Sequence, residues 1–303
     1  MLISALDQSM KIGAVCLGTF DGVHLGHQAI FKKTCEVARQ RQGLSVVFTF
    51  YPHPGAMVGR NKVGSITTRQ QRARLIAECG LDLLIEHPFT AEFASLSPEQ
   101  FVHEVLLRSF PKATVVAGFN YRFGHAAQGN VEILRTLGER HSFSVVEVPP
   151  VFVDGAIVSS TRVRQDILAG NFASITACLG RVFALQGAVG TGDGRGRTLG
   201  FPTANVHFLP EQVLPPSGVY AVFSRELGYG VANLGKRPTF PQASTTLEVH
   251  FFSPTPDLYG QELEVELLHY LRPESRFADQ ESLRLQIAKD IADASVYTLH
   301  QRT

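Results

Sequence analysis

The sequence lacks several features that would place the protein in a membrane, secreted or nucleic-acid-binding class. Its longest apolar runs are far too short to span a bilayer. The start, Met1 to Gln8, has no basic residues and is interrupted by Asp7, so we expect no signal peptide. A formal net charge of +1 argues against a large nucleic-acid surface, although a local basic groove is compatible with it. We therefore expect neither a membrane nor a nucleic-acid partner.

Cysteine is also scarce, and the cysteines that are present are scattered. Cys16, Cys35, Cys79 and Cys178 form no C-x-x-C pair. This pattern indicates free thiols in a reducing cytoplasm and argues against a disulfide framework or a zinc knuckle. Internal repeats and low-complexity segments are absent. What remains is a chain with 44% hydrophobic and 18% charged residues, typical of a globular protein. Its 303 residues are enough for two domains with separate cores.

The first part of the chain alternates between strand-like and helix-like patterns. Short apolar runs predict strands at Ala14–Leu17, Ser45–Phe50, Leu81–Ile85, Thr114–Ala117 and Ser144–Val148. Periodic segments between them predict helices near Gln28–Gln40, Arg69–Cys79, Pro98–Arg108 and Asn130–Arg140. The third of these helices has a clear start, with Ser97 as N-cap, Pro98 in the first turn and Gln100 completing a capping box. The alternation predicts a doubly wound α/β domain whose parallel sheet is covered on both faces.

The pattern changes after about residue 180. Segments that read as strands follow at Arg181–Val189, Gly218–Phe223, Gly230–Leu234, Leu247–Phe252 and Leu263–Tyr270. Turns rich in proline and glycine separate them, and the only strong helix is terminal, at about Gln280 to Ala294. These features predict a small antiparallel β-barrel with a terminal helix. With the boundary between Asn171 and Arg181, the domains would be residues 1–172 and 181–303.

A glycine-rich segment with two histidines, Gly18–His27, follows the first predicted strand. Ligands of parallel sheets bind at the carboxyl ends of the strands, so this segment falls in the expected crevice. His24 and His27 can donate hydrogen bonds to phosphate oxygens, and glycines and a helix start favour an anion. An isolated pair of histidines can equally be structural or bind a metal. A second segment, Ser159–Arg164, adds hydroxyl groups and two arginines suited to the far side of a triphosphate.

The second part of the chain has its own candidate site. The glycine-rich loop Gly190–Gly200 is neither a Walker A loop nor a G-x-G-x-x-G motif, and by itself it can be a plain turn. Thr203 and Asn205 follow, and in an extended segment their oxygens point to the same side, where they suit Mg²⁺. Glu248 can act as a general base toward a primary hydroxyl, or it can be a surface residue on a solvated strand face.

Taken together, Gly18–His27 and Ser159–Arg164 resemble the nucleotidyltransferase superfamily, which has a Rossmann-like fold and a histidine–glycine–histidine signature. An aminoacyl-tRNA synthetase is disfavoured, because the chain is short and has no lysine-rich second signature. Phe48–Pro54 and Gly118–Gly124 resemble the flavin-binding segments of prokaryotic FMN adenylyltransferases.

The second part resembles riboflavin kinases, whose fold is a six-stranded antiparallel barrel. The segments that carry this resemblance are Gly196–Asn205, Gly218–Tyr220, Pro238–Phe240, Leu247–His250, Asp257–Gly260 and Leu271–Glu274. The order of the two domains matches the prokaryotic bifunctional riboflavin kinase/FMN adenylyltransferases, also called FAD synthetases. The resemblance implies that riboflavin is phosphorylated to FMN, and that FMN is then adenylylated to FAD with release of pyrophosphate. It implies ATP as co-substrate, Mg²⁺ as cofactor, and riboflavin, FMN and FAD as substrates and products.

The resemblance also implies roles for individual residues. The implied catalytic residues are Glu248 as kinase base, and His24 and His27 as contacts of the α-phosphate. The implied nucleotide-binding residues are Gly18, Phe20, Asp21, Gly22, Ser160, Thr161, Arg164, Gly192, Gly194 and Arg197. The implied flavin-binding residues are Asn120, Phe50, His53, Arg272 and Glu274, and the implied metal ligands are Thr203 and Asn205.

The chain departs from the family pattern at two places. The loop Phe251–Pro256 is rich in proline and lies near the expected flavin entrance, which puts affinity and gating there in doubt. Gln70-Gln71-Arg72 replaces a common Glu-Lys pair, for which we expect only local surface consequences. Two other hypotheses stay open: a nucleotidyltransferase for another small phosphate, and a flavin or nucleotide sensor without catalysis. The sequence is compatible with an oligomer but does not predict one.

Overall fold

The structure is a computed structural model that describes residues 10–52, 54–57, 64–192, 196, 200–209, 211–236 and 245–299. Its contacts divide the chain into two compact units, Met1–Ser160 and Thr161–Thr303. This division lies earlier than the boundary between Asn171 and Arg181 that the sequence indicates. The difference arises because the two helices before residue 180 belong to the second unit.

The first unit is built around a parallel sheet with the strand order β3-β2-β1-β4-β5. The described strands are β1 (Ile12–Leu17), β2 (Leu44–Tyr51), β3 (Leu83–Pro88), β4 (Thr114–Gly118) and β5 (Val145–Val148). All of their pairings are parallel, which confirms the predicted fold class. The order reverses at β1, so the loop after β1 lies at the topological switch point, where such sheets bind ligands.

The four helices that the sequence predicts in this unit all form. They are α1 (Leu25–Gln40), α3 (Arg69–Glu78), α5 (Pro98–Phe101), which continues into the π-helix η1 (Val102–Leu107), and α6 (Val131–His141). The capping box at Ser97 and Gln100 is present as predicted. The π-helical part was not predicted, because the same apolar positions fit an α-helix. Several short elements were also missed: α2 (Pro54–Met57), α4 (Ala91–Ala94), the 3-10 turn η2 (His125–Ala127) and the hairpin of β6 (Phe152–Val153) and β7 (Ala156–Ile157).

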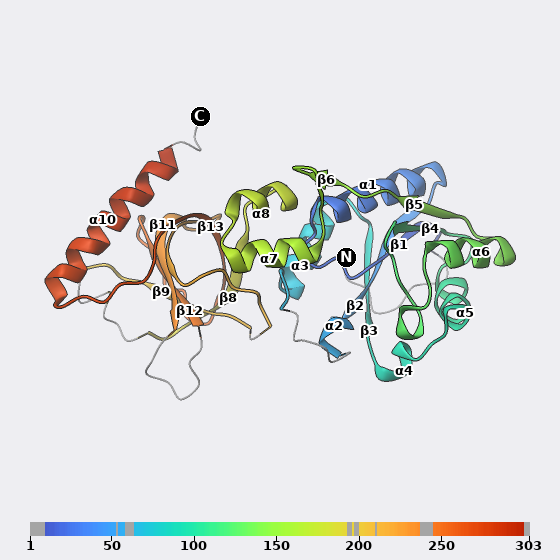
Figure 1. Cartoon of the computed structure of the whole chain (residues 1–303), viewed down its shortest axis with the longest axis horizontal. Helices are drawn as coiled ribbons and strands as arrows, with labels where there is room; N and C mark the ends of the chain where they lie inside the picture. Colours follow the sequence, from blue (N-terminus) through green and yellow to red (C-terminus); the bar gives the residue numbers. More distant parts are fainter. Residues whose placement is uncertain are drawn as a thin grey trace. The chain divides into compact units, whose positions relative to one another are not determined.

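Two hydrophobic cores lie on opposite faces of the sheet. Val15 and Leu17 of β1 contribute to one core, together with side chains of α5, η1 and α6. Ala14 and Cys16 contribute to the other, with side chains of α1 and α3. Figure 1 shows α3 and α5 on opposite sides of the sheet. Because both faces are covered, the open ends of the strands are the natural place for a site.

The prediction of a surface role for Gln70-Gln71-Arg72 is wrong. Gln71 is 3% exposed and Arg72 is 6% exposed. Gln71 completes a capping box with Thr68 at the start of α3. Arg72 forms a buried ion pair with Glu86 of β3. The polar run therefore joins α3 to the sheet.

The second unit contains a closed antiparallel barrel, as the resemblance implies. The described strands are β8 (Ala184–Gly190), β9 (Ala204–His207), β10 (Gly218–Ser224), β11 (Gly228–Lys236), β12 (Thr245–Phe251) and β13 (Glu262–Arg272). They follow the order β10-β11-β12-β9-β8-β13, and β13 pairs with β10 to close the barrel. The alternation in the sequence predicts all of these strands except β9, which is too short for a periodic signal.

Three helices accompany the barrel strands in the described part of this unit: α7 (Ser160–Ala169), α8 (Phe172–Leu179) and α10 (Gln280–Leu299). The Phe172 ring of α8 lies 5.7 Å from the buried Tyr220 ring of β10. The terminal helix α10 packs against β10, β11 and β13, and extends beyond the predicted end at Ala294 (Figure 1). In the described part of the chain, no helix combines the length and the apolar character needed to cross a membrane.

Candidate active sites

The loop between β1 and α1 has an unusual backbone. Phe20, Gly22 and Val23 have positive φ values of 52°, 84° and 43°. Glycine adopts this region easily, but for a bulky or β-branched residue it is strained. Phe20 and Val23 are each only 1% exposed, so packing helps to hold them in place. Strain of this kind persists only where the surroundings fix it, and it is common at functional sites.

Asp21 is one of the groups that fix this loop. Its carboxylate is 2% exposed and accepts hydrogen bonds from the backbone of Ile66 and from the backbone and hydroxyl of Thr67, at 3.0–3.1 Å. The hydroxyl of Ser160 donates to the Asp21 carbonyl at 2.9 Å. We predicted Asp21 and Ser160 as nucleotide-binding residues. In the structure, both tie the loop to neighbouring segments.

The two histidines lie together at the start of α1. His24 is the N-cap, and its Nδ1 accepts from the His27 backbone nitrogen at 3.3 Å. A ring nitrogen that accepts carries no proton, so the neutral His24 ring carries its proton on Nε2, as a hydrogen-bond donor. The rings stack with centroids 3.6 Å apart and an interplanar angle of 19°. Because the two ring planes are nearly parallel, N–H groups in them also point in nearly parallel planes, which suits donation to neighbouring phosphate oxygens. Chelation of one metal ion would need two nitrogen lone pairs that converge on one point.

Two glycines allow this arrangement of rings. A Cβ at Gly26 would lie 3.1 Å from His24 Cε1, and a Cβ at Gly18 would lie 2.8 Å from the Phe20 ring. The Phe20 ring in turn meets the His27 ring edge-on, with centroids 5.2 Å apart. The Phe20 ring therefore packs against His27, and the absence of a side chain at Gly18 leaves room for that ring.

The residues predicted to lie on the pyrophosphate side come from both units. Thr161 and Arg164 are on α7, three residues apart and hence on one face of the helix. Ser160, the last residue of the first unit, begins this helix and bonds to the glycine loop. The structure therefore brings Ser160 to the loop with the histidines.

The aromatic residues near the ends of β2 and β4 divide into buried and exposed groups. Phe50, predicted to bind flavin, is 8% exposed, and its ring lies 5.3 Å from the rings of both Phe89 and Phe93. Tyr51 is 46% exposed and Phe119 is 37% exposed, at strand ends on either side of β1. Both lie within the two segments that resemble flavin-binding segments, but neither is among the individual residues predicted to bind flavin. Alternation along β2 predicts that Phe50 and Tyr51 face opposite sides.

Asn120 and Tyr121 follow β4 and differ in environment. Asn120 is exposed, as a ligand-binding side chain requires. Tyr121 stacks on Phe123 at 5.6 Å, and burial raises the pKa of its hydroxyl. On the neighbouring strand, burial raises the pKa of the Cys16 thiol to about 12, so this thiol stays protonated beneath the site. The predicted flavin-binding residue His53 lies outside the described residues.

The barrel aligns polar residues of adjacent strands in one row. Asn205 of β9 is opposite Glu248 of β12, and Glu248 is opposite Asn233 of β11. On the other side, Asn205 is opposite Gly190 of β8. Residues opposite each other in antiparallel strands have side chains on the same face, about 5 Å apart at Cβ. The predicted base and the predicted metal ligand are therefore neighbours, and Asn233 is an additional member that the sequence analysis missed.

The glycine-rich loop lies against this row. A Cβ at Gly192 would overlap the side-chain amide of Asn205. A Cβ at Gly196 would lie 3.2 Å from Thr203 Oγ1. The loop therefore approaches both predicted metal ligands at a distance that only glycine permits. Gly194 and Arg197 lie outside the described residues.

Arg272 and Glu274 were both predicted to border the flavin, but they have different neighbours. Glu274 accepts a hydrogen bond from Asn233 at 3.3 Å, and a Cβ at Gly235 would overlap its carboxylate. Arg272 instead donates to both carboxylate oxygens of Asp290 on α10, at 2.8 and 2.7 Å. The structure brings Glu274 to the polar row and gives Arg272 the role of attaching α10.

A cavity of about 170 Å³ lies between the start of β9, the end of β12 and the proline-rich loop. Its lining residues are Pro202, Ala204, Val249, His250, Phe251, Phe252, Ser253, Pro254 and Thr255. His250 Nδ1 donates to the Pro202 carbonyl at 2.9 Å and fixes one wall. The departure from the family pattern at Phe251–Pro256 thus forms part of the wall of this cavity.

Comparison with protein families matches both halves of the chain. A family model described as FAD synthetase matches residues 7–162. A model described as riboflavin kinase matches residues 179–298. The chain belongs to the bifunctional riboflavin kinase/FMN adenylyltransferase family. The resemblance read from the sequence, including the order of the domains, is confirmed.

Individual relatives agree with this family membership over nearly the whole chain. The bifunctional riboflavin kinase/FMN adenylyltransferase of Escherichia coli K12 is 37% identical and aligns with 95% of this chain and 94% of its own. That of Listeria monocytogenes is 34% identical over 93% and 91%. A crystal structure described as a macrolide-efflux protein from Streptococcus pneumoniae superposes with a TM-score of 0.82 and 31% identity, covering 96% of both chains. The two-domain fold is therefore shared with a solved structure.

Proposed function

We propose that the chain makes FAD from riboflavin in two ATP-dependent steps at two separate sites. The barrel domain, residues 181–303, phosphorylates riboflavin to FMN. The α/β domain, residues 1–172, adenylylates FMN and releases pyrophosphate. The observation that carries the proposal is the row of Asn205, Glu248 and Asn233 under a glycine loop, in the same chain as the histidine pair on α1.

In the kinase step, Glu248 acts as the general base. It accepts the proton of the riboflavin primary hydroxyl as the oxygen forms a bond to the γ-phosphorus of ATP. The bond between the γ-phosphorus and the bridging oxygen breaks, and its electron pair leaves with ADP. Asn233, which is opposite Glu248 and donates a hydrogen bond to Glu274, orients the hydroxyl.

Thr203 and Asn205 are the residues that would hold Mg²⁺. A hydroxyl and an amide oxygen are hard donors, and Gly192 and Gly196 bring the phosphate loop against both of them. When bound, Mg²⁺ neutralises phosphate charge. Gly192 and Gly196 of this loop position the phosphates of the nucleotide.

In the adenylylation step, a phosphate oxygen of FMN bonds to the α-phosphorus of ATP. The bond from the α-phosphorus to the oxygen bridging to the β-phosphate breaks, and the electron pair leaves with pyrophosphate. The Nε2 proton of His24, the His27 ring and the N-terminus of α1 stabilise the charge on the α-phosphate. Thr161 and Arg164 are assigned to pyrophosphate, Asn120 to the nucleotide or flavin, and Tyr51 and Phe119 to the flavin surface.

Product analysis with two variants tests the proposal. From riboflavin, ATP and Mg²⁺, the unaltered chain should form FMN and then FAD. Glu248→Gln should lower the rate of FMN formation by about 100-fold or more, while FMN plus ATP still yields FAD. His27→Ala should lower the rate of FAD formation by a similar factor, about 100-fold, so that FMN accumulates.

Matched controls are the exposed residues Glu226, in the turn after β10, and His141, at the end of α6. Glu226→Gln and His141→Ala should leave both rates unchanged. Wild-type kinase rates in Glu248→Gln would show that the base is assigned wrongly. Failure of the unaltered chain to form FMN would favour a nucleotidyltransferase for another phosphate, and flavin binding without ATP consumption would favour a sensor.

A further inference from the structure

Arg72 is the most deeply buried arginine of the described residues, and it lies directly behind the histidine loop. Its side chain is 7% exposed, and the carboxylate of its partner Glu86 is 1% exposed. The Arg72 Nη2 atom lies 2.5 Å from Glu86 Oε1. Desolvating two charges costs several kcal/mol each, and a helix could be attached more cheaply by apolar packing. A buried pair is therefore weak evidence of a purely stabilising role.

The other contacts of Arg72 lead to the loops of the adenylylation site. Its Nη1 donates to the carbonyl of Thr19 at 3.2 Å, and its Nη2 donates to the carbonyl of Phe50 at 3.1 Å. Thr19 immediately precedes the strained residue Phe20, and Phe50 lies at the end of β2 next to the exposed Tyr51. One guanidinium thus joins the glycine loop to the strand end where the flavin surface begins.

The segment that carries Arg72 holds the same loop at a second place. The backbone of Ile66 and Thr67, just before α3, donates to the Asp21 carboxylate. The strained stretch from Phe20 to Val23 is therefore held by Arg72 before it and by Ile66 and Thr67 in its middle. Both contacts originate from α3 and its N-terminal turn, which is itself closed by the capping box of Thr68 and Gln71.

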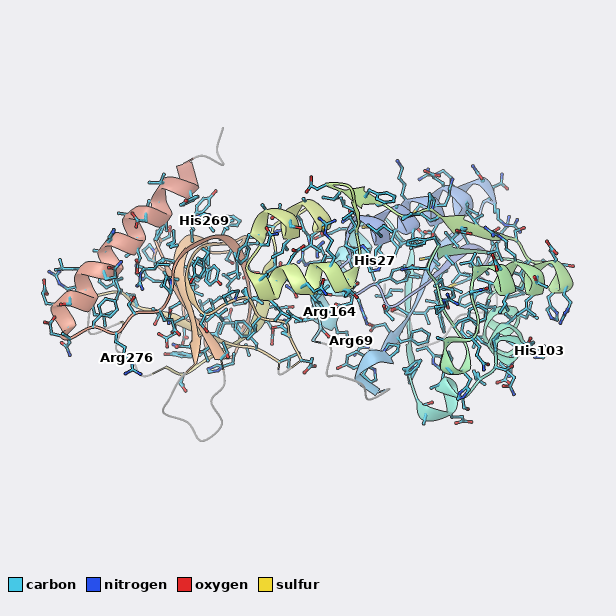
Figure 2. The ribbon with its side chains drawn as sticks, viewed as in Figure 1. His27, Arg69, His103, Arg164, His269 and Arg276 are labelled. Atoms are coloured by element: carbon cyan, nitrogen blue, oxygen red, sulfur yellow. The ribbon has the colours of Figure 1, made fainter. Side chains whose placement is uncertain are left out.

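Glu86 also connects this cluster to the surface of the site. Arg69 Nε donates to Glu86 Oε2 at 2.6 Å, and the Arg69 guanidinium lies 4.7 Å from the centre of the Tyr51 ring. Arg69 is half-exposed and is labelled in Figure 2. The carboxylate of Glu86 thus aligns two guanidinium groups, one beneath the histidine loop and one against an exposed aromatic ring.

We propose that Arg72, held by Glu86, is a positioning residue for the adenylylation step. It fixes the carbonyls of Thr19 and Phe50, and through the strained loop it fixes the position of His24 and His27 relative to the flavin surface. It does not touch the substrates. This inference rests on adenylylation of FMN as the function of the first unit. A misplacement of reacting groups by about 1 Å costs about 100-fold in rate, so the effect should appear in kcat rather than in the fold.

The first test is the Arg72→Ala variant, assayed with FMN and ATP in the presence and absence of guanidinium ion. We expect kcat for FAD formation to fall about 100-fold, with the KM for FMN changed less than about 3-fold. Guanidinium, well below denaturing concentrations, should occupy the space beside Glu86 and restore at least about 10-fold of the loss. Methylammonium, which lacks the planar fork, should restore less. Riboflavin phosphorylation by the same sample should stay unchanged.

A second variant separates positioning from stability. Arg72→Met combined with Glu86→Gln removes both charges, and replacing a buried pair in this way is often neutral for stability. We expect its unfolding temperature to stay near that of the unaltered chain while kcat for FAD formation falls as in Arg72→Ala. The matched control is Arg135→Met, which breaks the ion pair between α6 and β5 in the same unit at Arg135 and Glu147. This control should leave FAD formation unchanged.

FAD formation within about 3-fold of the unaltered chain in both Arg72 variants, or a loss equal to that of Arg135→Met, would overturn the inference. The inference would also be overturned if guanidinium did not restore FAD formation in Arg72→Ala while the double variant with Arg72→Met and Glu86→Gln was fully active. If the unaltered chain forms no FAD from FMN and ATP, the proposed function fails first, independently of Arg72.

Discussion

At the scale of the residue, the proposed kinase site depends on the absence of a side chain at Gly192. The loop reaches Asn205 because no Cβ separates them. Glutamate and asparagine can be recognised in a sequence as residues that are able to act as a base or to bind a metal ion. The close approach that makes them a site depends on glycines, whose role becomes visible only in three dimensions.

Gly192→Ala is therefore expected to impair the kinase selectively. The new methyl group overlaps the Asn205 amide, so the loop must move away, and we expect kcat/KM for ATP in FMN formation to fall about 100-fold. Steady-state kinetics with riboflavin measure this loss. The control is Gly228→Ala, whose φ is +80° but whose Cβ would meet nothing within 4 Å. It should lose stability of about 1 kcal/mol through backbone strain and keep its activity.

Arg72 illustrates what residue-level reading of a sequence misses. The run Arg69-Gln70-Gln71-Arg72 has no apolar periodicity, so it reads as a solvated face. Burial of Gln71 and Arg72 follows from the capping box and from Glu86, which is fourteen residues further along the chain than Arg72. Glu86 lies on β3, and the pairing of β3 with β2 places it beside Arg72. Local composition does not indicate this contact.

At the scale of the element, strands and helices with a clear apolar period were predictable. The parallel strands of the first unit are short apolar runs, and Leu263–Leu267 alternates as a half-solvated strand must. β9 has only four residues and follows a proline, so it carries no period. The register that sets Asn205 beside Glu248 and Asn233 was also unreadable, because alternation fixes the face of a residue and not its cross-strand neighbour.

The helix α10 is expected to depend on one buried carboxylate. Asp290 is 4% exposed and accepts from Arg272 and from Gln286. Asp290→Asn removes the charge and leaves Arg272 without its ionic partner, which should lower the free energy of unfolding of the barrel by about 3 kcal/mol. Thermal unfolding checks this value, and FAD formation from FMN should be unaffected.

The exposed pair of Arg284 and Glu281 on the same helix provides the control. Glu281→Gln should leave the unfolding temperature unchanged, because exposed ion pairs contribute little to stability. Equal losses in the two variants would show that the Asp290 contact is not what attaches α10.

At the scale of the whole molecule, the two proposed sites lie in separate domains of one chain. We therefore expect that one copy of the chain can make FMN and another copy can convert it to FAD. Glu248→Gln should form FMN about 100-fold more slowly while it retains the histidine pair. His27→Ala should form FMN normally but adenylylate it about 100-fold more slowly. An equimolar mixture of the two variants, given riboflavin and ATP, should therefore form FAD after a lag in which free FMN accumulates. Chromatography that resolves FMN from FAD over time measures both. A mixture that makes FMN and never FAD would contradict the independence of the sites.

The closure of the barrel has a consequence for the order in which the chain folds during its synthesis. The parallel sheet is complete once β5 has left the ribosome, so the first unit can fold early. The described barrel strands close only through β13, which pairs with both β8 and β10 and is the last of them to be made. Until then β8 and β10 keep unpaired backbone edges, which attract other strands. Translation that stops before Glu262 should therefore release a folded, active adenylylation unit attached to an aggregation-prone remainder.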